Sequence, residues 1–331
     1  MTSTRIDLLR RRILDESRHA VLVSILAESY ESQDNNVFLV PPGLSRIRRY
    51  REFRLYLSRA RSINGHPIPL RRGLPVEARI DTHVFQINAC NWHCWYCYVD
   101  DSRLAGQAKT GQFLSAEELV STYRELAEKP PVIDLSGGEP DLTPEWTLWI
   151  LNEVERVGLT GQVLVWQETN LSTRLLWEVL DRSDISYMAA FPGHSRVGCF
   201  KGFDEVSFAF NTRANPRNFV EQFEIFRNLV GAGFEMYAYA TLTGPAGHCS
   251  RPRVASFLDR LQRVHPLLPL RTIPLRVVPF AATKARLGGV SMSAALHEQN
   301  RAGDYWDEEL ERRFSRDELQ MPYEDVVIDA G

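Results

Sequence analysis

The stretch Cys90-Asn-Trp-His-Cys94-Trp-Tyr-Cys97 holds three of the five cysteines of the chain. It follows the apolar run 83–88, which is typical of a β-strand. Thiolates this close in sequence can converge on one metal centre, and soft thiolate ligands select zinc, copper(I) or an iron–sulfur cluster. A structural zinc site needs four protein ligands, and an ordinary cubane cluster needs four cysteines. Three cysteines in one loop therefore leave one position open to an external ligand.

This C-x3-C-x2-C spacing, with the aromatic Tyr96 before the last cysteine, resembles the signature of the radical S-adenosylmethionine (SAM) superfamily. The resemblance implies a [4Fe–4S] cluster that is bound by Cys90, Cys94 and Cys97 and whose open iron is chelated by SAM. In that superfamily the reduced cluster cleaves SAM to methionine and a 5′-deoxyadenosyl radical. The resemblance also implies an electron donor such as flavodoxin or ferredoxin, and it places Tyr96 against the adenine of SAM.

A second stretch, Ser136-Gly-Gly-Glu-Pro140, follows the next expected strand. Glycines allow the backbone to approach a ligand closely. The stretch resembles the GGE(P) motif of the superfamily, which receives the amino group of SAM. It implies cofactor contacts at Gly137, Gly138, Glu139 and Pro140. The alternative is a tight strand-to-helix turn, for which glycine pairs are common.

A third stretch, Glu168-Thr169-Asn170, ends the following strand. It resembles the Asp-Thr-Asn sequence of glycyl-radical-enzyme activases, in which the acidic residue lies by the ribose or the amino acid part of SAM. It implies that Glu168 and Asn170 contact SAM, with glutamate in place of aspartate. The alternative is a helix N-cap at Thr169 or Asn170. No catalytic residue is named by these motifs.

The arrangement of strands and helices predicts the fold class. From residue 81 strands alternate with helices, which implies a parallel sheet. We expect six strands, at 83–88, 132–135, 162–166, 185–190, 234–242 and 270–280. Six such units fit the partial (β/α)6 TIM-like barrel of the superfamily, in which active residues lie at the carboxyl ends of strands. The expected domains are a mostly helical, Arg-rich extension over 1–80, the core barrel over 81–290 and an acidic helical tail over 291–331.

The charge of −3 over 331 residues conceals an asymmetry between the two ends. Residues 1–80 contain 15 arginines, no lysine and 8 acidic residues, whereas residues 302–331 contain 10 acidic residues and 3 arginines. We expect extension helices over 5–31 and 45–61. The arginines of the second are interpreted either as a solvated helix face or as a dock for an acidic peptide, a nucleotide or a polynucleotide. No nucleic-acid-binding motif accompanies them.

The apolar runs are shorter than the roughly 18 residues of a membrane span, and the N-terminus does not fit a signal peptide. A cytoplasmic protein that does not enter the membrane is expected. A loop over 198–203 is expected above the barrel mouth. There Lys201 would meet a substrate carboxylate or SAM, or would be an ordinary solvated lysine.

Several functions stay open at this point. A radical SAM enzyme with one cluster could modify a peptide or protein, modify a nucleotide or RNA, or activate a glycyl-radical enzyme. From another class, a non-catalytic zinc-binding scaffold would complete its site with His93, Cys199 or Cys249. That scaffold leaves the glycine-rich stretch unexplained.

Overall fold

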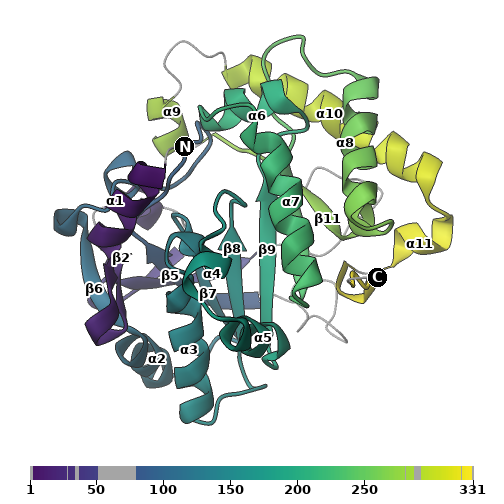
Figure 1. Ribbon diagram of the computed structural model, residues 1–331. Helices are drawn as coiled ribbons and strands as arrows, with labels where there is room; N and C mark the ends of the chain where they lie inside the picture. Colours follow the sequence, from purple (N-terminus) through teal and green to yellow (C-terminus); the bar gives the residue numbers. More distant parts are fainter. Residues whose placement is uncertain are drawn as a thin grey trace.

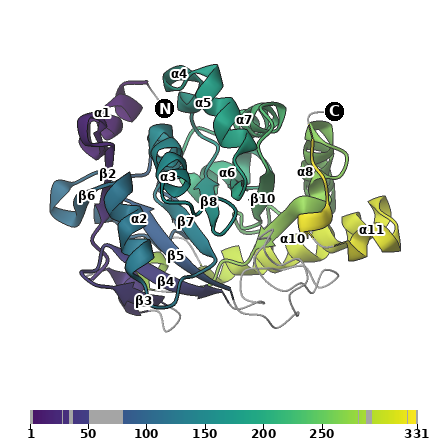
Figure 2. The ribbon, with the colours of Figure 1, turned by 90° about the horizontal axis from the view of Figure 1, so that it is seen from below.

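The computed structural model of the chain describes residues 3–27, 29–33, 37–50, 80–279, 281–286, 292–321 and 323–329. Its centre is a sheet of parallel strands in the order β5–β7–β8–β9–β10–β11. Their bounds are β5 Ile80–Ile87, β7 Val132–Gly137, β8 Leu164–Thr169, β9 His194–Phe200, β10 Met236–Thr241 and β11 Thr272–Leu275. Within the described residues β11 pairs only with β10, so the sheet curves without closing (Figures 1 and 2). The predicted partial six-strand barrel is confirmed.

Helices connect these strands and lie on one side of the sheet (Figure 1). They are α2 Ala116–Glu125, α3 Pro144–Arg156, α4 Leu175–Val179, α5 Arg182–Ala190, α6 Glu205–Thr212, α7 Asn218–Gly231 and α8 Arg251–Val264. A capping box between Ser115 and Glu118 begins α2, because each side chain accepts from the other residue's backbone N–H. Helix α7 turns Phe219, Phe223 and Phe226 towards the core.

Alternating strand residues separate two apolar clusters. Val165 of β8 points outward and belongs to the large cluster under the helices. Trp166 points into the barrel, where it packs with Tyr237 of β10 at a ring-centroid distance of 5.2 Å. The barrel interior is thus filled by side chains near its middle. The functional groups are left to the carboxyl ends of the strands.

The first part of the chain is a helix followed by strands. Helix α1 covers Ser3–Ile13, β1 covers Leu14–Asp15 and β2 covers Ala20–Ser24. The predicted helix over 5–31 is therefore wrong beyond Ile13. The reason is that β2 is buried along its whole length between β6 (Gly111–Ser115) and the end of β5. A strand buried on both faces has a continuous apolar run without alternation, which can be mistaken for a helix.

The second predicted extension helix, over 45–61, is also wrong where it is described. Ser45–Tyr50 is strand β4, which pairs antiparallel with both β3 (Val37–Val40) and β5. The rest of that range, and the arginines in it, lie outside the described residues. In a strand, Arg46 and Arg48 share one face because side chains alternate with a period of two. Of the described N-terminal residues, only α1 forms an α-helix.

The fourth predicted strand, 185–190, is wrong because these residues lie in α5. Asp181 caps that helix by accepting from the backbone N–H of Asp184 at 2.9 Å. The fourth strand is β9, so Cys199 is a strand residue and the loop above the barrel begins only after Phe200. The other five predicted strands are confirmed, with boundaries shifted by a few residues.

The C-terminal part is helical, as expected. It contains α9 Ala281–Arg286, α10 Met292–Arg313 and α11 Arg316–Gln320. Trp306 of α10 packs on Phe257 of α8 with ring centroids 6.0 Å apart. None of the described helices is both long and apolar enough to cross a membrane.

Candidate functional site

The cysteine loop, residues 88–100, leaves β5 at the carboxyl end of the barrel. Cys94 is buried, Cys90 and Cys97 are half-buried, and none of them is in a disulfide. The backbone N–H of Cys90 donates to Leu104 O at 3.0 Å, and that of Cys97 donates to Cys94 O at 3.1 Å. One short, internally bonded loop therefore carries all three thiols.

The protonation of these thiols depends on what lies beside them. Burial raises the pKa of Cys94 to about 11, with a further contribution from the charge of Cys97. Burial raises the pKa of Cys90 even more. Lys201 and Arg286 act in the opposite direction on the pKa of Cys94. The raised pKa values keep the thiols of Cys90 and Cys94 protonated at neutral pH, so a positively charged metal centre would be needed to bind them as thiolates.

A mononuclear zinc site has little support in the described part of the chain. There, no three Cys, His, Asp or Glu side chains converge closely enough to hold one metal ion. His93 instead faces Asp101, with Nδ1 and Oδ1 3.6 Å apart, and the backbone N–H of Cys249 donates to Glu298. A cubane cluster binds each thiolate through a different iron, so its ligands need not meet at one point. The loop suits a cluster better than a single zinc ion.

Two glycines let the end of β7 pack directly on the cysteine loop. Gly137 has φ of +92°, and a Cβ at this position would lie 1.8 Å from Gln86 Cγ. A Cβ on Gly138 would lie 1.8 Å from Ala89 O. Glu139 then donates its backbone N–H to Ala89 O at 2.8 Å. The glycine-rich turn and the cysteine loop are therefore in contact.

Glu139 is buried and bonded to residues from two strand ends. Its Oε1 accepts from Thr169 Oγ1 at 3.0 Å and from the backbone N–H of Asp141 at 3.2 Å. Its Oε2 accepts from the backbone N–H of Asn170 at 2.7 Å. Burial, followed by the charge of Asp141, raises the pKa of Glu139 to about 8. Asp141 is itself held by Arg196, whose Nη2 lies 2.6 Å from Oδ1. The carboxyl group thus joins β7 to β8 and can accept further hydrogen bonds on its free lone pairs.

A pH-dependent stability follows from this carboxyl group. A pKa that is higher in the folded than in the unfolded protein contributes stability below the unfolded value of 4.5, and this is lost as the pH rises through about 8. In Glu139→Gln the side chain cannot ionise, so this pH dependence is removed. The amide NH2 group can also face the Asn170 N–H donor, which destabilises the folded variant. We expect the variant to be less stable than the wild type at pH 6 and the difference to narrow by pH 9. Urea unfolding of the metal-free protein at both pH values measures this, and a constant difference would contradict it.

Two of the predicted site residues lie at the end of β8. Asn170 donates from Nδ2 to Asn91 Oδ1 at 3.0 Å and to Cys90 Sγ at 3.7 Å, so it touches the cysteine loop directly. Glu168 points into the barrel and is half-buried; burial raises its pKa, and Lys201 is the first of the cations that oppose this. Neither Thr169 nor Asn170 caps a helix, since α4 begins only at Leu175.

Tyr96 crosses the barrel mouth. Its hydroxyl accepts from Thr241 Oγ1 of β10 at 3.0 Å. The neighbouring Trp95 is buried and donates from Nε1 to Asn211 Oδ1 at 3.0 Å. The hydroxyl of Tyr96 therefore ties the cysteine loop to the end of β10, while Trp95 is a packing residue that anchors the loop.

Cationic side chains gather around Glu168. Lys201, directly after β9, is half-buried; burial lowers its pKa, but Cys199, Tyr96 and other groups outweigh this and raise it well above the ordinary value. Arg46 and Arg48 of β4 lower the pKa of Glu168, and Arg46 Nη1 donates to Gln86 Oε1 at 3.0 Å. Both guanidinium groups lie less than 6 Å from the ring centroid of Tyr98. The helix interpretation missed this pair, although the alternation Arg-x-Arg was a signal for it.

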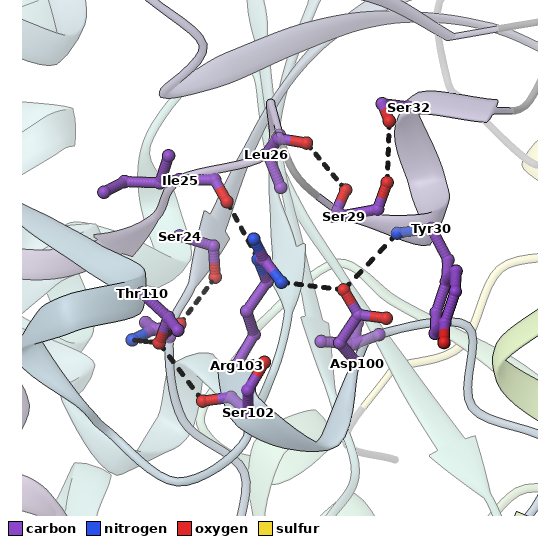
Figure 3. Close-up of polar contacts among 12 residues, drawn as sticks. Ser24, Ile25, Leu26, Ser29, Tyr30, Ser32, Asp100, Ser102, Arg103 and Thr110 are labelled. Atoms are coloured by element: carbon purple, nitrogen blue, oxygen red, sulfur yellow. Dashed lines mark hydrogen bonds and ion pairs between the residues drawn. The ribbon is translucent and has the colours of Figure 1, made fainter. Parts of the chain in front are cut away.

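The N-terminal segment holds the far end of the cysteine loop in place (Figure 3). Arg103 donates from Nε to Ile25 O at 2.8 Å and from Nη1 to Asp100 Oδ2 at 2.7 Å. Asp100 also accepts from the backbone N–H of Tyr30 at 3.4 Å. Because Arg103 and Asp100 are buried, these charge-assisted bonds are stronger than exposed ones. Ile25 and Tyr30 thus fix the loop from the side of β2.

Comparison with known families identifies this arrangement. The sequence model described as the radical SAM superfamily matches residues 84–244, from within β5 to just beyond β10. Residues 84–244 form a radical SAM domain. The match contains the cysteine loop, the glycine-rich turn and Glu168. The cofactors of that superfamily are a [4Fe–4S] cluster and SAM.

Solved structures that match this radical SAM chain include SuiB of Streptococcus suis bound to S-adenosylmethionine, at 13% identity and a TM-score of 0.47, over 70% of this chain and 47% of SuiB. SuiB bound to precursor peptide SuiA matches at 14% identity and a TM-score of 0.39, over 55% of this chain and 36% of SuiB. The chain thus spans less than half the length of SuiB. No curated protein sequence matches it.

Proposed function

We propose that this radical SAM enzyme binds one [4Fe–4S] cluster through Cys90, Cys94 and Cys97, and that it abstracts hydrogen from a substrate in the barrel opening. The observation that carries the proposal is the contact between the cysteine loop and the glycine-rich turn at the carboxyl end of the barrel. When bound, the reduced cluster supplies the electron that cleaves SAM to a 5′-deoxyadenosyl radical. Cys199 and Cys249 are the two remaining cysteines and are too few to bind a second cluster, which supports a single cluster.

Residues around the loop would hold SAM. The turn of Gly137, Gly138, Glu139 and Pro140 offers backbone groups and a carboxyl group to the amino group of SAM. Asn170 bonds to both Glu139 of this turn and Cys90 of the loop, and it would keep the distance between them fixed. Glu168 and the ring of Tyr96 face the same opening, where they suit the ribose and the adenine. Apolar packing below them excludes water from the reacting atoms.

The charges of the opening favour a substrate that carries an anionic group. Lys201, Arg48 and Arg46 lie close enough to Glu168 to lower its pKa. Complementary charge attracts and orients a ligand. An acidic peptide or protein and a nucleotide both meet this requirement. Of the arginines expected in a helical dock, Arg46 and Arg48 would thus act at the reaction site. An electron donor such as flavodoxin or ferredoxin stays a prediction.

A glycyl-radical-enzyme activase is the alternative. It rests on the resemblance of Glu168-Thr169-Asn170 to the activase sequence. An activase would generate a persistent glycine-centred radical on a partner enzyme, which electron paramagnetic resonance detects. Absence of that signal with a candidate partner would leave the peptide- or nucleotide-modifying enzyme.

The proposed function is tested by anaerobic reconstitution followed by a product assay. We expect brown protein with about four irons per chain, and 5′-deoxyadenosine on adding SAM and dithionite. One colourless zinc ion per chain, or a cluster that leaves SAM intact, would overturn the proposal. Once cleavage is established, acidic peptides and nucleotides are compared by the substrate-dependent increase in deoxyadenosine.

A further inference from the structure

Arg286, the last residue of α9, reaches the cysteine loop from the C-terminal part of the chain. Its Nη1 donates to Cys97 O, its Nη2 donates to Val99 O, and its Nε donates to Asp101 Oδ1 at 2.8 Å. The side chain is 5% exposed. Three groups within five residues of the loop are thus bound by one planar guanidinium group.

Such an arrangement is costly unless every donor is satisfied. A buried charge is tolerated only when it is paired and hydrogen-bonded. Arg286 meets this condition with two backbone carbonyls and one carboxylate, and the planar fork of arginine can bind them together where the ammonium of lysine cannot. The backbone carbonyls of Cys97 and Val99 lie outside any strand or helix, and Arg286 supplies their hydrogen-bond donors.

Other contacts place Arg286 where it is. Arg213, at the C-terminal end of α6, donates from Nη2 to Arg286 O at 2.8 Å. Nearby, Ala295 of α10 packs in a small cluster with the buried Trp95 of the cysteine loop. Residues beyond the matched radical SAM domain therefore also contact the loop.

We propose that Arg286 is a positioning residue that fixes the half of the loop carrying Cys97 and holds a permanent positive charge beside the cluster. This inference rests on the proposed binding of the cluster by the cysteine loop. Reduction adds one negative charge to a cluster, and a nearby cation favours the reduced form. Arg286 thus has two effects, one on the order of the loop and one on the reduction potential.

Two substitutions separate these effects. Arg286→Met removes both the hydrogen bonds and the charge, whereas Arg286→Lys keeps the charge and loses the fork. Arg174→Met is the matched control, since it also removes an arginine that pairs with a carboxylate, but this ion pair with Glu224 of α7 is exposed. The measurements are hydrogen exchange of peptide 94–104 in the metal-free protein, irons per chain after reconstitution, and a redox titration of the cluster.

For Arg286→Met we expect at least about tenfold faster exchange of that peptide, faster loss of iron to a chelator and a more negative midpoint potential. A tenfold lower ratio of reduced to oxidised cluster at a fixed potential corresponds to about 59 mV for one electron. Arg286→Lys should share the faster exchange and keep a midpoint close to that of the wild type. Arg174→Met should match the wild type in all three measurements.

Exchange and midpoint both at wild-type values in Arg286→Met would overturn the inference. If that variant does not fold, the exchange rate of Arg286→Lys decides instead. A wild-type protein that binds no iron would refute the proposed function, but not the effect of Arg286 on loop exchange, which is measured without metal.

Discussion

Cys94→Ala is expected to abolish both cluster binding and SAM cleavage. Cys94 is the middle one of the three proposed ligands, and two remaining thiols cannot hold a cubane cluster with one open iron. Iron should fall from about four per chain to less than about one, and deoxyadenosine formation should fall by at least about 100-fold. Iron analysis and chromatography of the reaction measure the two quantities.

Cys249→Ala is the matched control for this change. Cys249 is also a buried free thiol, but its backbone N–H bonds to Glu298 and it lies outside the cysteine loop. Its substitution should leave iron content and cleavage near the wild-type values. Equal losses in both variants would point to general damage to the fold, and undiminished cleavage in Cys94→Ala would remove the role assigned to the loop.

Gly138→Ala is expected to have the second largest effect. The new Cβ would lie 1.8 Å from Ala89 O, a backbone atom that cannot move without displacing the cysteine loop. Overpacking of a buried site costs about 3 kcal/mol at the upper end of the usual range. We expect a loss of stability of about that size, together with a loss of iron after reconstitution. Urea unfolding and iron analysis measure both.

Gly231→Ala, at the end of α7, is the control for adding a methyl group. A Cβ at this position meets nothing within 4 Å. Alanine favours helix over glycine by up to about 1 kcal/mol, so stability should stay the same or rise slightly. A Gly138→Ala variant as stable as Gly231→Ala would show that the close approach of the turn to the loop is not required.

Much of the barrel could be predicted from the sequence because its strands are short apolar runs between helix signals. The strand β9 escaped prediction because it is rich in polar and small residues. Its Arg196 is buried only through the ion pair with Asp141, and Gly198 gives room to Phe226. The partners Asp141 and Phe226 lie in other parts of the chain, so the local sequence of β9 does not predict a buried strand.

The candidate site divides in the same way. Cys90, Cys94 and Cys97 lie in one short stretch and the glycine-rich turn lies in another, so each motif could be recognised locally, and the resemblance to the superfamily assigned both to one site. Arg286 lies 189 residues beyond Cys97 and belongs to no motif. Its contact with the loop depends on where α9 packs, which local sequence does not determine.

The distance along the chain between Cys97 and Arg286 has a consequence for biosynthesis. At roughly 5–20 residues per second, the ribosome needs about 10 to 40 seconds to add the 189 residues that separate them. During that time the nascent polypeptide displays its thiols without the arginine that completes their surroundings. We therefore expect the proposed cluster to be inserted after translation, when the C-terminal helices have packed against the loop.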